Sequence, residues 1–147
     1  MESSALQIAQ AVFERINVDN STFLKEILVG IFTSLHFYRN NTKSKVIPSA
    51  IMKCIHTFLA VFMICHSSQV LIDACNSIQK DILFMVLKSE ASAIKYVNEP
   101  ARDRKYCLVA YSRLLAEYAP TMPRETVMEL ICALLEAASP ITKSTGF

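Results

Sequence analysis

Histidine and cysteine are the residue types of this chain that could bind a metal ion. Structural zinc sites commonly use spacings such as Cys-x-x-Cys or His-x-x-x-His, and neither spacing occurs in the sequence. Cys65 and His66 are adjacent, so on a helix their side chains would point about 100° apart. We therefore expect no metal ion or other cofactor. The three histidines are interpreted as core or helix-end residues, namely His36, His56 and His66.

Two further combinations could do acid–base or nucleophilic chemistry. Glu125 and Glu129 lie one helical turn apart, but an acidic face stabilised by a helix dipole is the commoner use of such a pair. Cys107 lies near Lys105 and could be an activated thiol, yet its place on an apolar helical stripe favours an inert core cysteine. Only two glycines are present, which excludes the glycine-rich phosphate-binding and nucleophile-elbow motifs. We expect no enzyme activity.

A basic cluster is the surface feature that we interpret as a possible partner contact. Arg102, Arg104 and Lys105 open a predicted helix, where positive charge is unfavourable and suggests a functional reason. An acidic protein partner would suit them. The formal net charge of +2 is too small to indicate nucleic acid binding. The methionines could form an adaptable binding groove, although buried filler is their commoner use.

The elements that must position these residues are helices. Scarce glycine argues against sheets and tight hairpins, and apolar residues recur at intervals of three and four along the chain. Helical segments are predicted at about 4–16, 22–38, 45–66, 70–78, 82–97 and 102–118, with a last one ending before Pro140. Residues 79–81 could either join or separate two of these segments.

The segments group into antiparallel pairs at about 4–38, 45–97 and 102–138. Pairs repeating at this distance resemble HEAT or armadillo units, so the fold class predicted is all-α. We expect residues 1–147 to form a single HEAT-like α-solenoid segment of about three stacked helix pairs. The chain is 52% hydrophobic and 19% charged, and a solenoid fragment with exposed ends would account for that excess.

Eight consecutive apolar residues, 58–65, lie inside the third segment. A membrane span needs roughly 20 apolar residues, and polar side chains flank this run on both sides, so we expect no membrane insertion. The same apolar spacing continues around Ile51 and Ile55. A helix that is apolar on most of its circumference must be covered by protein on several sides. We therefore predict a buried helix in the middle of the stack.

From Lys43 onward the sequence resembles a known family. The matching residues run from 78 to 122 without a gap: Ile78, Gln79, Phe84, Met85, Val86, Leu87, Arg104, Lys105, Cys107, Leu114, Leu115, Glu117, Pro120 and Met122. They are similar to the carboxy-terminal region of the cellular apoptosis susceptibility exportins, the importin-alpha re-exporters of the importin-beta superfamily. Lys80 and Ala93 stand where relatives are expected to have proline, which predicts straighter or longer helices there.

The resemblance implies a protein-binding function. Receptors of this family bind importin-alpha together with the GTP form of the GTPase Ran, and they shuttle between nucleus and cytoplasm. The chain is several-fold too short to encircle such partners, so we interpret it as a fragment or short form. The free cysteines and the absence of a signal-peptide pattern at the N-terminus predict a reducing intracellular compartment. A HEAT-repeat scaffold for cytoskeletal or signalling partners is the alternative hypothesis.

Overall fold

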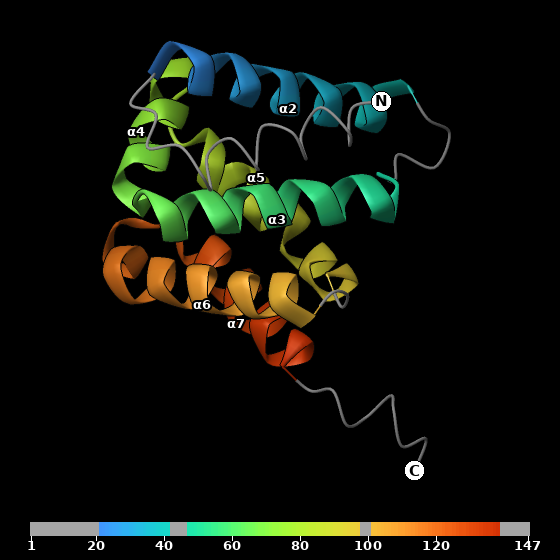
Figure 1. The fold of residues 1–147 in the computed structure, drawn as a ribbon, viewed down its shortest axis with the longest axis vertical. Helices are drawn as coiled ribbons and strands as arrows, with labels where there is room; N and C mark the ends of the chain where they lie inside the picture. Colours follow the sequence, from blue (N-terminus) through green and yellow to red (C-terminus); the bar gives the residue numbers. More distant parts are fainter. Residues whose placement is uncertain (1–20, 42–46, 98–100, 139–147) are drawn as a thin grey trace.

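The computed structural model describes residues 21–41, 47–97 and 101–138 (Figure 1). They form six α-helices: α2 (Ser21–Asn41), α3 (Ser49–Cys65), α4 (Ser68–Ile78), α5 (Ile82–Glu90), α6 (Ala101–Tyr118) and α7 (Arg124–Ala137). Two 3-10 helices, η1 (Ala91–Tyr96) and η2 (Ala119–Thr121), follow α5 and α6. These ranges contain no strand, which confirms the all-α prediction. The helix expected at 4–16 lies outside the described residues.

The helices pack as a layered stack. Helices α3 and α6 lie side by side and run in the same direction, and α7 lies behind them (Figure 1). Helix α7 packs on α5 and η1, and η1 also contacts α3, while α2 packs on α4. The result is a small HEAT-like arrangement of packed helices. The division into pairs at 4–38, 45–97 and 102–138 remains a prediction.

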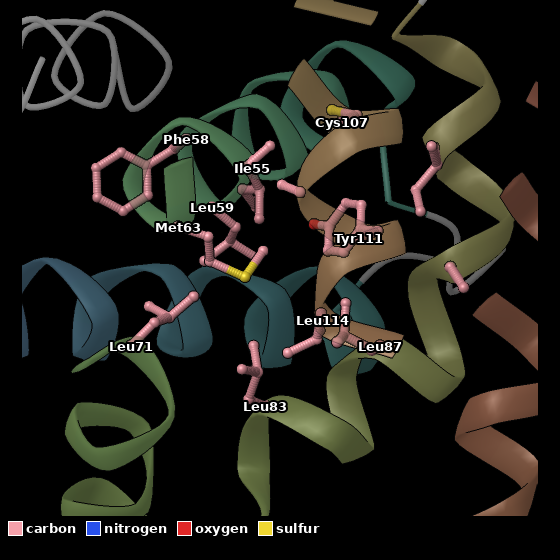
Figure 2. Close-up of a cluster of buried hydrophobic side chains, with 14 of the residues drawn as sticks. Ile55, Phe58, Leu59, Met63, Leu71, Leu83, Leu87, Cys107, Tyr111 and Leu114 are labelled. Carbon is pink, nitrogen blue, oxygen red and sulfur yellow. The ribbon is translucent and has the colours of Figure 1, made fainter. Parts of the chain in front are cut away.

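Helix α3 is the centre of the core. Every residue from Ile55 to Met63 is buried, and α4, η1 and α6 all contact this helix. Side chains from α3, α4, α5 and α6 interdigitate around Leu59 and Tyr111 (Figure 2). Phe62 is only 3% exposed, so the predicted covering by protein is confirmed. Within the described ranges, no helix is long and apolar enough to cross a membrane.

The structure moves one predicted helix start and decides one boundary that the sequence left open. Helix α3 begins at Ser49 rather than Lys45, because Pro48 has an extended ψ of 137° and lies just before the helix. Residues 79–81 separate α4 from α5. Asp81 has a φ of 61° there, a left-handed conformation that aspartate tolerates better than most residues. The Asn76 side chain accepts a hydrogen bond from the Asp81 backbone N–H at 2.9 Å, which stabilises the turn.

The expectation of longer helices at Lys80 and Ala93 is wrong. Helix α4 ends at Ile78, before Lys80, and α5 gives way at Ala91 to the 3-10 helix that contains Ala93. Proline is not needed at either place. Gln79 has an extended backbone (φ −157°, ψ 133°) and ends α4, and the left-handed Asp81 immediately precedes α5. At the second, the tighter 3-10 turn allows Ala91, Ala93 and Ile94 to be buried together.

The last two helices, α6 and α7, bury apolar residues that recur at intervals of three and four, with one exception. Cys107, Ala110, Tyr111 and Leu114 of α6 are all buried, as their spacing predicts. In α7, Leu130 and Leu134 are buried, whereas Ile131, which continues the same apolar spacing, is 39% exposed. Only one side of α7 meets α5, α6 and η1, so Ile131 faces outward. Pro140 lies outside the described residues.

Candidate functional site

The three basic residues predicted to contact a partner begin helix α6 but point to different surroundings. Arg104 turns toward α7 and donates two hydrogen bonds to the carbonyl of Ala137, at 3.1 Å from Nε and 2.6 Å from Nη2. Ala137 is the last residue of α7, where the orphan carbonyls and the helix dipole both attract a cation. Arg104 therefore stabilises the end of α7.

Arg102 and Lys105 are both exposed. The Arg102 Nε lies 3.5 Å from the carboxylate of Asp103, and its guanidinium lies 5.7 Å from the ring centre of Tyr106. Lys105 makes no hydrogen bond or ion pair with any residue in the described ranges. Arg102 thus lies beside Asp103 and Tyr106, and Lys105 is exposed to solvent. Arg104 points away from both, toward the end of α7.

A polar cluster that extends from the interior to the surface joins four helices. We call Arg39 of α2, His56 of α3, Glu90 at the end of α5, and Tyr111 of α6 the polar joint. His56 Nε2 lies 2.9 Å from the backbone carbonyl of Glu90, and Nδ1 lies 2.8 Å from the Tyr111 hydroxyl. A carbonyl oxygen can only accept, so Nε2 carries the hydrogen, and Tyr111 donates to Nδ1.

Glu90 connects this histidine to the helix α2. Its backbone carbonyl accepts from His56, while its carboxylate accepts from Arg39 through Nε at 2.8 Å and also through Nη2. The Glu90 side chain is 10% exposed and that of Arg39 is 45% exposed. A largely buried carboxylate must be paired to be tolerated, so Arg39 and Glu90 form the outer end of the polar joint.

Burial fixes the protonation states inside the joint. Desolvation lowers the pKa of His56 to about 4, although its hydrogen bond to Glu90 acts in the opposite direction. Burial raises the pKa of Tyr111 well above its usual value. His56 is therefore neutral and Tyr111 protonated at pH 7, and in these states both imidazole nitrogens are hydrogen-bonded.

The cysteines fall into buried and exposed groups. Cys107 is 1% exposed and its thiol lies 3.7 Å from the backbone carbonyl of His56. Burial raises the pKa of the Cys75 and Cys107 thiols to about 12, which keeps both thiols protonated at pH 7. Cys65 and Cys132 are exposed rather than in the core. In the ranges that the structure describes, no group of three or more potential ligands could hold a metal ion.

A surface groove of about 330 Å³ lies between α2 and α5. Its walls are largely apolar, from Phe32 and Leu35 on one side and from Ile82 and Met85 on the other, with the Arg39–Glu90 pair at one part of the lining. Such a mixture suits protein side chains better than a charged small molecule. Glu125, the acidic residue of the first turn of α7, pairs with Lys88 at 3.1 Å.

The sequence did not reveal the polar joint. His56 and Tyr111 are 55 residues apart, and Arg39 and Glu90 are 51 apart, so no local pattern connects them. The available signal was a histidine and a threonine next to the longest apolar run. Thr57 satisfies its hydroxyl locally, on the carbonyl of Lys53 at 2.8 Å, whereas His56 needs partners from other helices.

Comparison with known proteins gives one match that covers almost the whole chain. The family described as "CAS/CSE protein, C-terminus" matches residues 1–144, which extends the resemblance through the N-terminal part of the sequence. This is a family of nuclear transport receptors and not of enzymes. No curated protein and no solved structure matches the chain. The helical stack and the family match agree, and the chain belongs to the CAS/CSE family of nuclear export receptors, in its C-terminal region.

Proposed function

We propose that the chain is a segment of an export receptor that returns importin-alpha to the cytoplasm in complex with Ran-GTP. The family match over residues 1–144 is the observation that carries this proposal. The function is protein–protein binding, and the protein shuttles between nucleus and cytoplasm. Packed helices that contact only their neighbours support it, because small rotations between such units add up to the large changes in curvature that loading requires.

The polar joint gives this segment a defined shape. It ties α2 through Glu90 to α3 and α6, so these elements move as one body. A receptor segment of this kind presents its surfaces in a fixed relation to one another, which reduces the ordering cost of binding a large partner. Flexing would then take place between segments and not within this one.

Arg102 and Lys105 are proposed to contact acidic side chains of a transport partner. Both are exposed at the start of α6, whereas Arg104 is engaged with Ala137. Rim charges of this kind change the association rate and its salt dependence more than the final affinity. The substitutions Arg102→Glu and Lys105→Glu should slow association with the partner, and Arg113→Glu, an exposed site further along the same helix, is the matched control.

Affinity capture from nuclear extract tests the proposed partners. The chain is immobilised and incubated with extract supplemented either with a non-hydrolysable GTP analogue or with GDP, and bound proteins are identified by mass spectrometry. Importin-alpha and Ran should be recovered together in the GTP arm and not in the GDP arm. Recovery of tubulin or a phosphatase in both arms, without importin-alpha, would favour the scaffold alternative.

A further inference from the structure

Helix α7 has an outward face with two distinct edges. One edge is an apolar strip of Met128, Ile131 and Leu135, which are 52%, 39% and 67% exposed, with the exposed Cys132 beside them. Residues three, four and seven apart lie on one side of a helix, so the strip is continuous and about 10 Å long. Exposed apolar side chains scattered singly are ordinary, but an aligned set indicates a contact surface.

A row of carboxylates borders the strip. Glu125, Glu129 and Glu136 are exposed on α7, and the helical repeat places them along one flank of the strip rather than around it. Lys88 of α5 pairs with Glu125. In the described parts of the chain, no basic side chain lies within ion-pair distance of Glu129 or Glu136. The outward face of α7 is thus apolar along one edge and negatively charged along the other.

We propose that this face of α7 docks an amphipathic helix of a protein partner that carries Lys or Arg along one flank. Apolar residues of that helix would cover Met128, Ile131 and Leu135, and its basic flank would neutralise Glu129 and Glu136. Helix-on-helix binding of this type uses anchors at i, i+3 or i+4, and i+7, with flanking charges that select the partner.

Charge complementarity favours a basic partner over a second copy of this chain. The outward face of α7 contributes a single basic residue, Arg124, against three glutamates. A second copy packed through the same face would bring more carboxylates and no basic row. This docking face lies on α7 and does not depend on the Ran and importin-alpha contacts proposed above.

A pair of designed peptides tests the proposal. Both form the same amphipathic helix with leucine anchors, one with lysines along one flank and the other with glutamates there, and each carries a fluorescent label. Binding to the full chain is followed by anisotropy at low and moderate salt. The lysine peptide should bind at least about tenfold more tightly, and raising the salt should shrink that difference.

Substitutions on α7 and on a control helix test whether the peptide binds at α7. Leu135→Asp should abolish binding, whereas Val109→Asp, at an apolar side chain of α6 that is 40% exposed, should leave it unchanged. The double substitution Glu129→Lys and Glu136→Lys should reverse the preference toward the glutamate peptide. Since all of these sites are exposed, circular dichroism and melting curves should match those of the unmodified chain. Equal binding of both peptides, or a preference that survives the double substitution, would overturn the proposal.

Alkylation of Cys132 reports the location independently. The lysine peptide should slow iodoacetamide labelling of Cys132 and leave the labelling of Cys65, exposed at the end of α3, unchanged. An unchanged rate at Cys132 would contradict docking on α7. Analytical sedimentation without peptide tests whether a second copy of the chain covers the strip instead. A stable dimer that Leu135→Asp dissociates would show that it does, and would overturn the proposed partner.

Discussion

At the scale of single residues, the hydrogen bond between Tyr111 and His56 can be tested directly by substitution. Tyr111 is fully buried and its hydroxyl donates to Nδ1 at 2.8 Å. Tyr111→Phe keeps the ring and leaves a buried nitrogen without a donor, which should cost about 1–3 kcal/mol of folding free energy. Urea denaturation measures this loss.

The matched control is Tyr96→Phe, because the Tyr96 side chain is 43% exposed and water can replace any partner of its hydroxyl. We expect a change within about 0.5 kcal/mol for that variant. Equal denaturation midpoints for the two variants would mean that the tyrosine–histidine hydrogen bond is not formed as described.

His56 also predicts how stability depends on pH. Its pKa is about 4 in the folded chain against 6.5 ordinarily, so between these values the unfolded chain binds more protons than the folded one. The contribution of neutral, buried His56 to the free energy of unfolding is therefore fully present above pH 6.5, and it is lost as the pH falls toward 4. From pH 7 to pH 5 the loss should be about 2 kcal/mol.

The variant His56→Gln isolates this pH effect from that of other groups. Glutamine has one donor and one acceptor and does not titrate, so the difference in unfolding free energy between the two proteins should shrink or reverse in favour of the variant as the pH falls from 7 to 5. A difference that stays constant over this range would show that His56 is not held neutral by burial.

At the scale of helices, the end of α7 depends on Arg104. Its guanidinium donates twice to the carbonyl of Ala137, and the site is partly buried. Arg104→Gln should destabilise the chain by about 1 kcal/mol and speed amide hydrogen exchange in the last turn of α7. Lys105→Gln, one residue further on and exposed, should do neither. Similar effects of the two substitutions would contradict the capping role.

The turn between α4 and α5 can be tested by substitution at Asp81. Asp81 has a φ of 61°, a conformation in which glycine is at no steric disadvantage and a β-branched residue is strained. Asp81→Gly should preserve or raise the melting temperature, since the hydrogen bond to Asn76 uses the backbone N–H, whereas Asp81→Val should lose about 1–2 kcal/mol. A more stable valine variant would argue for a continuous helix through this turn.

The sequence predicted the helices better than it predicted the contacts between them. The buried face of α6 follows from spacing, because Cys107, Tyr111 and Leu114 recur at intervals of three and four. Ile131 of α7 follows the same apolar spacing, yet its side chain is 39% exposed. Periodicity finds apolar positions, but it cannot tell which part of an apolar arc meets a neighbour and which part is left for a partner.

The polar joint was beyond prediction for a different reason. Pairing of His56 with Tyr111, and of Glu90 with Arg39, depends on how helices far apart in the chain lie in space. Of the three basic residues singled out from the sequence, Arg104 has a partner that could be identified only once α7 was placed beside α6. The sequence shows that a positive charge lies at an unfavourable helix N-terminus, and the tertiary structure shows which hydrogen bonds compensate for it.

At the scale of the whole molecule, the layered helices form one body of a transport receptor. The core is continuous from α2 to α7, and the joint crosses it from Arg39 to Tyr111. The family to which the chain belongs is one of transport receptors, which act through protein partners. The chain's surfaces are therefore where its function must be measured.

Binding to purified importin-alpha tests this account most directly. Labelled importin-alpha is titrated with the chain in the presence of Ran bound either to a non-hydrolysable GTP analogue or to GDP, and the affinities are compared. Coupling between two partners is a ratio of affinities, and we predict binding at least about tenfold tighter with the GTP form. The same affinity with both nucleotide forms, or no binding with either, would contradict the proposed function.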